Sequence, residues 1–282
     1  MSALPALAAD TDRLSPHRFA KLSALIFDKT GIKMPATKAT MLQGRLQRRL
    51  RDTGMATLDQ YCDHLFDGSA DPQEMIHLIN AVTTNKTDFF REPGHFDFMA
   101  KTALPTLVDN GRRRIRAWSA ACSTGAEPYT MAMILDQFAQ GSGTDYGILA
   151  TDIDTAVLET ARLGIYPAEL VEPVPASLRQ RYVVNAIDRK TNKVRIVPHL
   201  RSAIGFARLN LMDASYPVGE PMDLIFCRNV LIYFDKPTQE KVVRRLCDCL
   251  APGGYLFLGH SESIAGMDLP VTTASYTVFR KG

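Results

Sequence analysis

Hydrophobic residues in the first third of the chain recur three or four positions apart, which is the spacing of a helix. This period, together with residues that begin and end helices, predicts four helices. The first begins at Ser15-Pro16 and ends at Gly31, the second runs from Thr37 to Gly54, the third begins at Thr57, and an Asp71-Pro-Gln-Glu74 capping box begins the fourth. The sequence therefore predicts an all-helical domain over residues 15–82, after a flexible tail at residues 1–14.

The pattern changes after residue 93, where apolar strands alternate with amphipathic helices. Strands are predicted near residues 114–119, 146–151, 203–209, 223–227, 254–259 and 275–280, and helices near 127–139, 155–163 and 237–250. This alternation predicts an α/β domain over residues 93–282, with a mostly parallel, Rossmann-like sheet covered on both faces. The link between the last two strands is too short for a helical crossover, so we expect them to pair antiparallel.

Two segments interrupt this order. Residues 83–92 form a linker between the predicted domains, and residues 168–202 form an insertion in the second one. Within the insertion, the alternating segments 182–187 and 194–197 flank turn residues at 188–193, which predicts an antiparallel β subdomain outside the main sheet. Insertions of this kind are typical of docking surfaces or lids.

Composition narrows the class of protein. The 282 residues are 46% hydrophobic and 22% charged, as in ordinary globular proteins, and a net charge of +3 is too small to indicate nucleic-acid binding. The sequence has no signal-peptide pattern and no run of about 18 apolar residues, so we expect a cytoplasmic protein without membrane insertion. The five cysteines are scattered without paired spacing, which supports neither disulfides nor a metal site.

The turn at residues 120–127, directly after the first predicted strand, is the leading candidate for a ligand site. It consists of small residues with one glycine, Gly125, and ends at Glu127. A dinucleotide would need further glycines around its pyrophosphate, so a nucleoside without phosphate, such as S-adenosylmethionine, fits better. Asp152 ends the second strand, where a carboxylate can accept both ribose hydroxyls; capping the helix that begins near Thr155 is its alternative role.

More polar side chains follow the later strands and occupy the linker. Those beyond the third and fourth strands are Asn210, Arg228, Asn229 and Tyr233. Those in the linker are Asn85, Thr87 and Arg91. The adjacent pair Phe89-Phe90 would anchor the linker while its polar side chains face a cleft.

Together these segments resemble the chemotaxis receptor methyltransferase (CheR) family. The matching text is Asn85-Lys-Thr-Asp-Phe-Phe-Arg-Glu92, Ala121-Cys-Ser-Thr-Gly-Ala-Glu-Pro-Tyr129, Ala150-Thr-Asp-Ile-Asp154, Phe226-Cys-Arg-Asn-Val-Leu-Ile-Tyr-Phe-Asp235 and Gly259-His-Ser-Glu-Ser263. The resemblance extends from about residue 15 to the end of the chain, in the family's order and spacing. It implies an enzyme that transfers the methyl group of S-adenosylmethionine to glutamate side chains of chemoreceptors and releases S-adenosylhomocysteine. The implied fold is a helical N-terminal domain and a methyltransferase domain with a small β subdomain.

The resemblance also implies roles for single residues. The cofactor would be bound by Asn85, Thr87, Arg91, Glu127, Asp152, Asn210 and Leu211, with Cys227, Arg228 and Asn229 close by. Arg91 and Tyr233 match positions proposed to act near the reacting methyl group. Ala126 stands where some members have a second acid, a difference that we expect to matter little.

Basic residues concentrate in the helical domain, where residues 15–54 hold nine Lys and Arg against two acids. In the second helix an apolar seam is flanked by Lys38, Arg45, Arg48 and Arg49. This stripe is either a solvated face or a docking surface for the Glu-rich cytoplasmic domains of chemoreceptors, and the family resemblance favours docking. In some members the β subdomain also holds a receptor's C-terminal peptide by adding a strand, and the loop at 188–193 leaves that role open here.

Two other functions stay open on the residues alone. One is a regulator that binds S-adenosylmethionine without turnover. Arg91 and Tyr233 argue against it, because a protein that has lost its enzymatic activity has no need of either residue at these positions. The other is a methyltransferase with a different acceptor, against which the charge pattern of the second helix discriminates only weakly.

Overall fold

The computed structural model describes residues 13–185 and 192–282, and the chain forms two compact units, residues 1–83 and 84–282. Most of the predicted tail, residues 1–12, lies outside the described residues. Leu14, which the prediction included in the tail, is 7% exposed and packs in the core of the first unit. No helix in the described part of the chain is long and apolar enough to cross a membrane.

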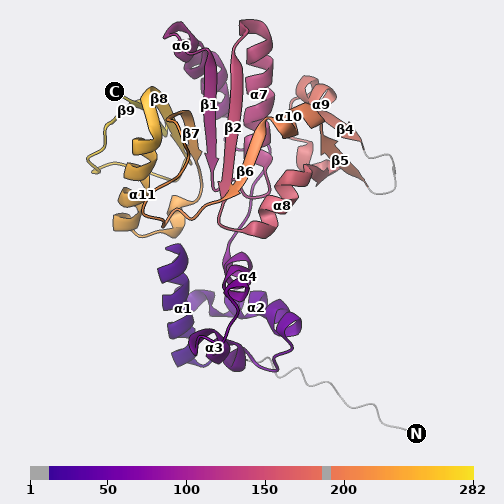
Figure 1. The fold of residues 1–282 in the computed structure, drawn as a ribbon, viewed down its shortest axis with the longest axis vertical. Coiled ribbons are helices and arrows are strands. Elements are labelled where there is room, and N and C mark those ends of the chain that lie inside the picture. The colour runs from indigo at the N-terminus through magenta and orange to yellow at the C-terminus, as the bar shows by residue number, and fades with distance from the viewer. Residues whose placement is uncertain (1–12, 186–191) are drawn as a thin grey trace. The chain divides into compact units, whose positions relative to one another are not determined.

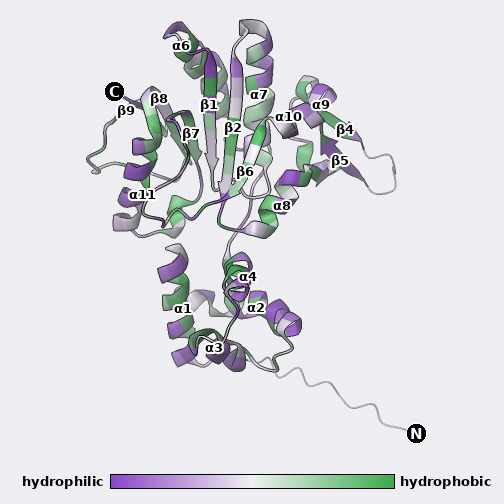
Figure 2. Ribbon diagram, viewed as in Figure 1, coloured by the Kyte–Doolittle hydropathy of each residue, from purple (hydrophilic) through white to green (hydrophobic). Residues whose placement is uncertain are grey.

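The described part of the first unit consists of four α-helices, which are labelled in Figure 1. They are α1 (Pro16–Thr30), α2 (Ala39–Thr53), α3 (Leu58–Phe66) and α4 (Pro72–Val82), with a 3-10 turn, η1 (Ala36–Lys38), before α2. Ser15 and Thr57 cap α1 and α3 through their side chains, and α1 and α2 end at Gly31 and Gly54, as predicted. Each helix buries one stripe of apolar side chains; in α2 these are Leu42, Leu46 and Leu50. Figure 2 shows the corresponding hydrophobic and hydrophilic sides of α1.

The capping box predicted at the start of α4 is half confirmed: Asp71 caps the helix, but Glu74 does not complete the box. Asp71 accepts a hydrogen bond from Gln73 N (2.8 Å), but the Glu74 side chain does not return to the helix end. It instead accepts hydrogen bonds from Arg49 Nη2 (2.6 Å) and Tyr61 Oη (2.7 Å). Long-range charge pairing therefore outweighs the local capping pattern, and it ties α4 to α2 and α3.

The second unit is built on a seven-stranded sheet of order β6-β2-β1-β7-β8-β10-β9. The strands are β1 (Arg114–Ala120), β2 (Asp145–Asp152), β6 (Ile204–Arg208), β7 (Met222–Cys227), β8 (Leu250–Leu258), β9 (Val271–Ser275) and β10 (Val278–Lys281). The first five strands in this order run parallel, and β10 pairs antiparallel with both β8 and β9. The parallel sheet and the antiparallel end are thus confirmed, but residues 275–280 form parts of two strands, because the chain turns at Tyr276 and Thr277.

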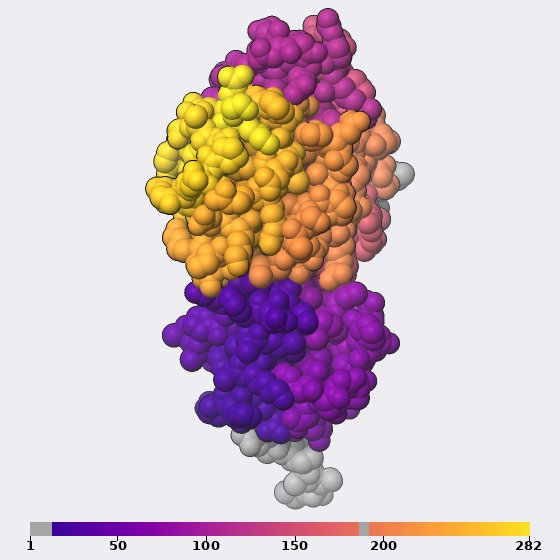
Figure 3. Space-filling model, turned by 60° about the vertical axis from the view of Figure 1, so that its left-hand side comes forward, coloured from indigo at the N-terminus to yellow at the C-terminus, as the bar shows by residue number. Residues whose placement is uncertain are grey.

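Helices connect the parallel strands. They are α7 (Ala126–Ser142), α8 (Thr155–Leu163) and α11 (Lys236–Cys249), all near their predicted positions. Because parallel crossovers are right-handed and the strand order reverses between β1 and β7, α7 and α8 cover one face and α11 the other. Three elements before β1 were not predicted: α5 (Pro93–Phe98), the π-helical η2 (Met99–Ala103) and α6 (Leu104–Asp109). In the space-filling view the C-terminal residues (yellow) lie directly against the preceding part of the chain, which is coloured gold (Figure 3).

The insertion forms a second, three-stranded antiparallel sheet of order β3-β5-β4. The predicted hairpin is present as β4 (Val183–Asn185) and β5 (Lys193–Ile196), while the third strand, β3 (Ile165–Pro167), was not predicted. Residues 186–191, which include the end of the predicted segment 182–187 and most of the predicted turn at 188–193, lie outside the described part. Between these strands lie η3 (Ala168–Val171) and α9 (Ala176–Tyr182), and α10 (Pro198–Ser202) leads back to β6.

Candidate functional site

The turn after β1 has an unusual backbone. Ala121, Ser123 and Gly125 all have positive φ angles, of 64°, 51° and 95°. Left-handed geometry costs a non-glycine residue about 1–2 kcal/mol, and such strain is concentrated at functional sites. A Cβ on Gly125 would lie 2.9 Å from both Ala161 Cβ and Tyr166 Oη, so the turn is packed closely against α8 and β3. The turn is therefore a preformed cradle at the carboxyl end of β1, beside the point where the strand order reverses.

Asp152 ends β2 beside this cradle and is 6% exposed. Its Oδ2 accepts a hydrogen bond from Ser123 N (2.8 Å), and its Oδ1 accepts one from Asp154 N (2.9 Å). Burial raises the pKa of Asp152 to about 6, even though these backbone bonds oppose the shift. The alternative role as a helix cap is wrong, because Asp154 caps α8 instead, accepting from Ala156 N at 2.8 Å.

The linker residues lie against the same cradle. Asn85 Nδ2 donates to Asp154 Oδ2 (2.7 Å), and the Asn85 carbonyl accepts from Ser123 Oγ (2.8 Å). Phe89 is 1% exposed and packs edge-on against Tyr166, with ring centroids 5.2 Å apart, so the predicted aromatic anchor is confirmed. Thr87 lies between these contacts and is half-buried.

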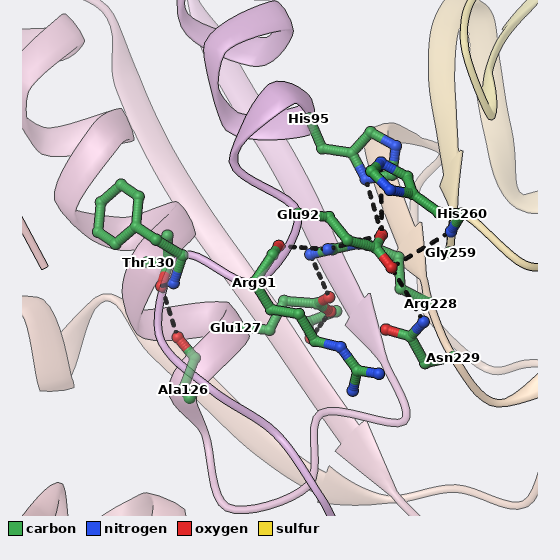
Figure 4. A network of polar contacts seen from close by, with 12 residues as sticks. Arg91, Glu92, His95, Ala126, Glu127, Thr130, Arg228, Asn229, Gly259 and His260 are labelled. Atoms are coloured by element: carbon green, nitrogen blue, oxygen red, sulfur yellow. Dashed lines mark hydrogen bonds and ion pairs between the residues drawn. The ribbon is translucent and has the colours of Figure 1, made fainter. Parts of the chain in front are cut away.

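Arg228 is held between two carboxylates at the end of β7 (Figure 4). Its side chain is 2% exposed; Nη2 lies 2.9 Å from Glu92 Oε2, and Nη1 lies 3.2 Å from Glu127 Oε2. Arg228 also donates to the Arg91 carbonyl. Glu127 accepts a further bond from Ser119 Oγ (2.6 Å). One cation thus joins the linker, the start of α7 and the end of β7.

The two carboxylates respond differently to this environment. Burial alone would raise the pKa of Glu92, but hydrogen bonds from Asn229 and Arg228 outweigh it and lower the pKa to about 2. Burial raises the pKa of Glu127, with Arg228 acting in the opposite direction. Glu92 is therefore the firmly ionised partner of Arg228.

Glu92, His95 and His260 also place potential metal-ligand atoms within 4.8 Å of one another. His95 is 2% exposed, and its Nδ1 has no hydrogen-bond partner among the described residues. Burial and, to a lesser extent, the charge of Arg228 together lower the pKa of His95 to about 4. However, Arg228 already neutralises the shared carboxylate of Glu92. We therefore assign the cluster to the polar network around Arg228 rather than to a metal.

Asn229 and the two predicted catalytic residues surround this network. Asn229 has a φ of 58°, and its Nδ2 donates to Glu92 Oε1 (3.1 Å). Arg91 Nη1 donates to the Lys86 carbonyl (3.1 Å), and Figure 4 shows its guanidinium extending away from Glu92. Tyr233 ends a 3-10 turn, η5 (Leu231–Tyr233), and is half-buried.

The remaining predicted cofactor residues are Asn210, Leu211 and Cys227. Asn210 follows β6, and its Oδ1 accepts from Met212 N (3.0 Å). Leu211 is 7% exposed and Cys227 is fully buried. These three residues follow or end strands of the same sheet, at its carboxyl edge.

The four predicted docking residues belong to the first unit and differ in their surroundings. Arg49 is 12% exposed and pairs with Glu74, and Arg45 Nη1 donates to the carbonyl groups of Val82 and Thr83 (both 2.7 Å). Arg48 is 82% exposed and lies 3.8 Å from Asp52. Lys38 is half-buried at the start of α2. Arg45 and Arg49 therefore serve contacts within the unit itself, whereas Arg48 projects outward.

The sequence interpretation missed three acceptor or donor residues of the site. They are Glu92, Ser123 and Glu262. Glu92 and Glu262 are acids inside the segments that resemble the CheR family, directly after Arg91 and two positions after His260. Their place in these segments could have indicated that they belong to the site.

Comparisons with known proteins agree on one family. Residues 85–279 match the family model described as the CheR methyltransferase SAM binding domain, and residues 17–83 match the CheR methyltransferase all-alpha domain. The chain is 39% identical over 261 residues to chemotaxis protein methyltransferase 2 of Pseudomonas aeruginosa, and the similarity covers 93% of this chain and 91% of the relative. It is 40% identical over 269 residues to the chemotaxis protein methyltransferase of Escherichia coli, with coverages of 94% and 91%.

Proposed function

This chain belongs to the CheR methyltransferase family, and we propose that it methylates glutamate side chains of chemoreceptors through the site around Asp152 and Arg228. It is an S-adenosylmethionine-dependent methyltransferase of chemotaxis, and its product is a glutamate methyl ester. The observation that carries the assignment of the site is the meeting of the cradle after β1 with the Arg228 network, at the point where the strand order reverses.

The residues present suit the cofactor. Asp152 is a buried carboxylate whose raised pKa reflects incomplete solvation, so hydroxyl donors of a ribose would stabilise its ionised form. The small residues of the turn at Ala121 and Ser123 let a ligand approach the backbone closely. The proposed binding set is completed by Asn85, Thr87, Arg91, Glu127, Asn210 and Leu211, with Cys227, Arg228 and Asn229.

The reaction needs placement more than proton transfer. When bound, S-adenosylmethionine supplies an electrophilic methyl group on a sulfonium that leaves as a neutral thioether. A glutamate acceptor with a pKa of about 4.3 is already ionised at neutral pH, so no general base is needed. In this proposal the Arg91 guanidinium orients the acceptor carboxylate, because the bond to the Lys86 carbonyl uses only one of its N–H donors. The Tyr233 hydroxyl contacts the methyl group or the acceptor oxygen.

Methyl transfer to glutamate is tested by the lability of the product. The protein is incubated with methyl-labelled S-adenosylmethionine and receptor cytoplasmic fragments, and the label released in base is counted. Methyl esters release methanol in base, whereas methylated amines and nucleobases do not. Absence of base-labile label across several receptors would rule out the glutamate assignment, and absence of all label would favour a binding protein without turnover.

The roles of Arg91 and Tyr233 are tested by Arg91→Ala and Tyr233→Phe at saturating cofactor. We expect both to lower kcat. Tyr276→Phe is the matched control, because Tyr276 is 68% exposed and its hydroxyl donates to the His260 carbonyl (3.0 Å), so its loss should leave kcat unchanged. Wild-type turnover in both Arg91→Ala and Tyr233→Phe would show that the assignment is wrong.

The basic face of α2 is proposed to bind the acidic receptor domains, with Arg48 as its exposed charge and Lys38, Arg45 and Arg49 beside it. Charge complementarity supports this proposal, because it speeds encounter and orients the partner. Arg48→Glu should raise KM for the receptor and leave cofactor affinity intact. Lys101→Glu changes the net charge equally, at a site 75% exposed in η2, and should not raise KM. An equal rise in both variants would contradict a docking role for α2.

The three-stranded sheet is the proposed binding surface for a receptor's C-terminal peptide. A hollow of about 440 Å³ lies between η3, α9 and the strands β4 and β5. Val184 of β4 is 48% exposed, and a peptide strand added beside β4 would pack against this apolar side chain. Val184→Glu should weaken binding of a synthetic tail peptide without changing methylation of a receptor fragment that lacks the tail. Unchanged peptide affinity would count against this surface.

A further inference from the structure

A buried carboxylate outside the proposed cofactor set holds the loop that carries Tyr233. Glu262 is 5% exposed and lies shortly after the end of β8. Its Oε2 accepts hydrogen bonds from Asn229 N (3.0 Å) and Gly259 N (2.6 Å), and its Oε1 accepts one from Leu231 N (2.7 Å). One carboxylate therefore fastens the loop after β7 to the end of β8.

The local backbone is built for this acceptor. The left-handed conformation of Asn229 brings N–H groups of neighbouring residues to one side of the loop, where they form an anion-binding concavity. A Cβ on Gly259 would lie 2.6 Å from Asn229 Nδ2 and 2.9 Å from Glu262 Oε2, so a glycine is needed for this approach. Buried N–H groups that lose their acceptor strongly destabilise the arrangement that contains them.

These bonds reach Tyr233 through a short rigid path. The bond to Leu231 N fixes the first residue of η5, and Tyr233 N donates to the Val230 carbonyl (3.1 Å) to close the turn. From the other side, Gln239 of α11 donates to the carbonyl groups of Leu231 (2.9 Å) and Phe234 (3.2 Å). Tyr233 thus lies between two anchors, one of which is Glu262.

We infer that Glu262 is a positioning residue for methyl transfer, acting through the loop 229–233 on the Tyr233 hydroxyl. The inference rests on the proposed role of Tyr233. An amide cannot replace the carboxylate, because both oxygens accept from N–H groups and the NH₂ of a glutamine would face at least one donor. Glu262→Gln should therefore displace the loop and lower kcat by about 10- to 100-fold, the effect expected of a misplacement near 1 Å.

The test is a double-mutant cycle with Tyr233→Phe, assayed with receptor fragments at saturating cofactor. In the Tyr233→Phe background, Glu262→Gln should lower kcat by less than about threefold, because both substitutions remove the same contribution of the Tyr233 hydroxyl. The Kd for S-adenosylhomocysteine should change less than kcat, since Glu92 still holds the Asn229 side chain. Glu262→Asp keeps two acceptor oxygens on a shorter side chain, so it should fold, recover part of kcat and depend on Tyr233 in the same way.

The matched control is Asp223→Asn. Asp223 is 3% exposed at the opposite end of β7, accepts from Arg116 N (2.9 Å) and pairs with Arg112 (2.8 Å), so its loss should lower stability but not kcat. Equal losses of kcat in Glu262→Gln and Asp223→Asn, or additive losses with Tyr233→Phe, would overturn the role of Glu262 while leaving that of Tyr233 intact. Wild-type kcat in Tyr233→Phe alone would refute the Tyr233 assignment, and with it this route of action.

Discussion

Cofactor affinity should depend on the protonation of Asp152, whose pKa burial raises to about 6. Only the ionised carboxylate can accept from both ribose hydroxyls, so the apparent Kd should scale as 1 + 10^(6 − pH). This factor is about 11 at pH 5 and close to 1 at pH 8. The weaker binding at pH 5 corresponds to a loss of about 1.4 kcal/mol of binding free energy relative to pH 8. The stability of the free protein should change with pH in the opposite direction to cofactor affinity. The folded state binds the Asp152 proton more tightly than the unfolded state does, so the contribution of Asp152 to the free energy of unfolding falls as pH rises towards 6.

The assay is calorimetric titration with S-adenosylhomocysteine between pH 5 and 8 at constant ionic strength, since the product binds without turnover. Asp152→Asn should bind weakly with a flat pH profile. Glu127→Gln is the control, because burial also raises the pKa of Glu127 and its removal should leave the Asp152 dependence in place. A flat profile for the wild type, or an unchanged slope in Asp152→Asn, would refute the role of Asp152.

Two further predictions concern stability. Arg228→Met leaves Glu92 and Glu127 without their shared cation, so urea unfolding at pH 7 should show that the free energy of unfolding falls by about 3–5 kcal/mol. A fall below about 1 kcal/mol would contradict a stabilising role for these two buried ion pairs. Gly125→Ala places a methyl group 2.9 Å from Tyr166 Oη in a left-handed backbone, so it should cost about 1–3 kcal/mol and weaken S-adenosylhomocysteine binding. Adding Tyr166→Phe should recover part of that loss, and no recovery would mean that backbone strain and the contact with Ala161 Cβ (2.9 Å) are responsible instead.

Local signals in the sequence sufficed for most of the fold. Ser15 and Thr57 cap helices where their side chains predict, and Gly31 and Gly54 end them, because these effects act within one helical turn. The segment 93–109 was missed because its prolines and Gly94 are typical of breaks. There Pro93 and Pro105 stand in the first turns of helices, where proline is tolerated.

The site was only partly predictable because its bonds join distant parts of the chain. Arg228 and Glu92 are 136 residues apart in sequence, and nothing in either segment specifies the partner. The same limit applies to the basic stripe of α2. A helical wheel places Arg48 and Arg49 on one flank, but it cannot reveal that Arg49 turns to Glu74, 25 residues away, while Arg48 remains exposed.

The strained backbone around the site also lowers the stability of this enzyme. Among the described residues, five of the seven non-glycine residues with positive φ belong to the linker, the cradle or the Arg228 loop: Phe90, Glu92, Ala121, Ser123 and Asn229. At about 1–2 kcal/mol each, they hold a strain comparable to the whole stability of a typical domain. Glycine at one of these positions, for example in place of Ala121, would relieve strain and raise the melting temperature. The turn would then need to be ordered by each incoming cofactor. Heat resistance and methyl transfer therefore place opposing demands on the same few residues.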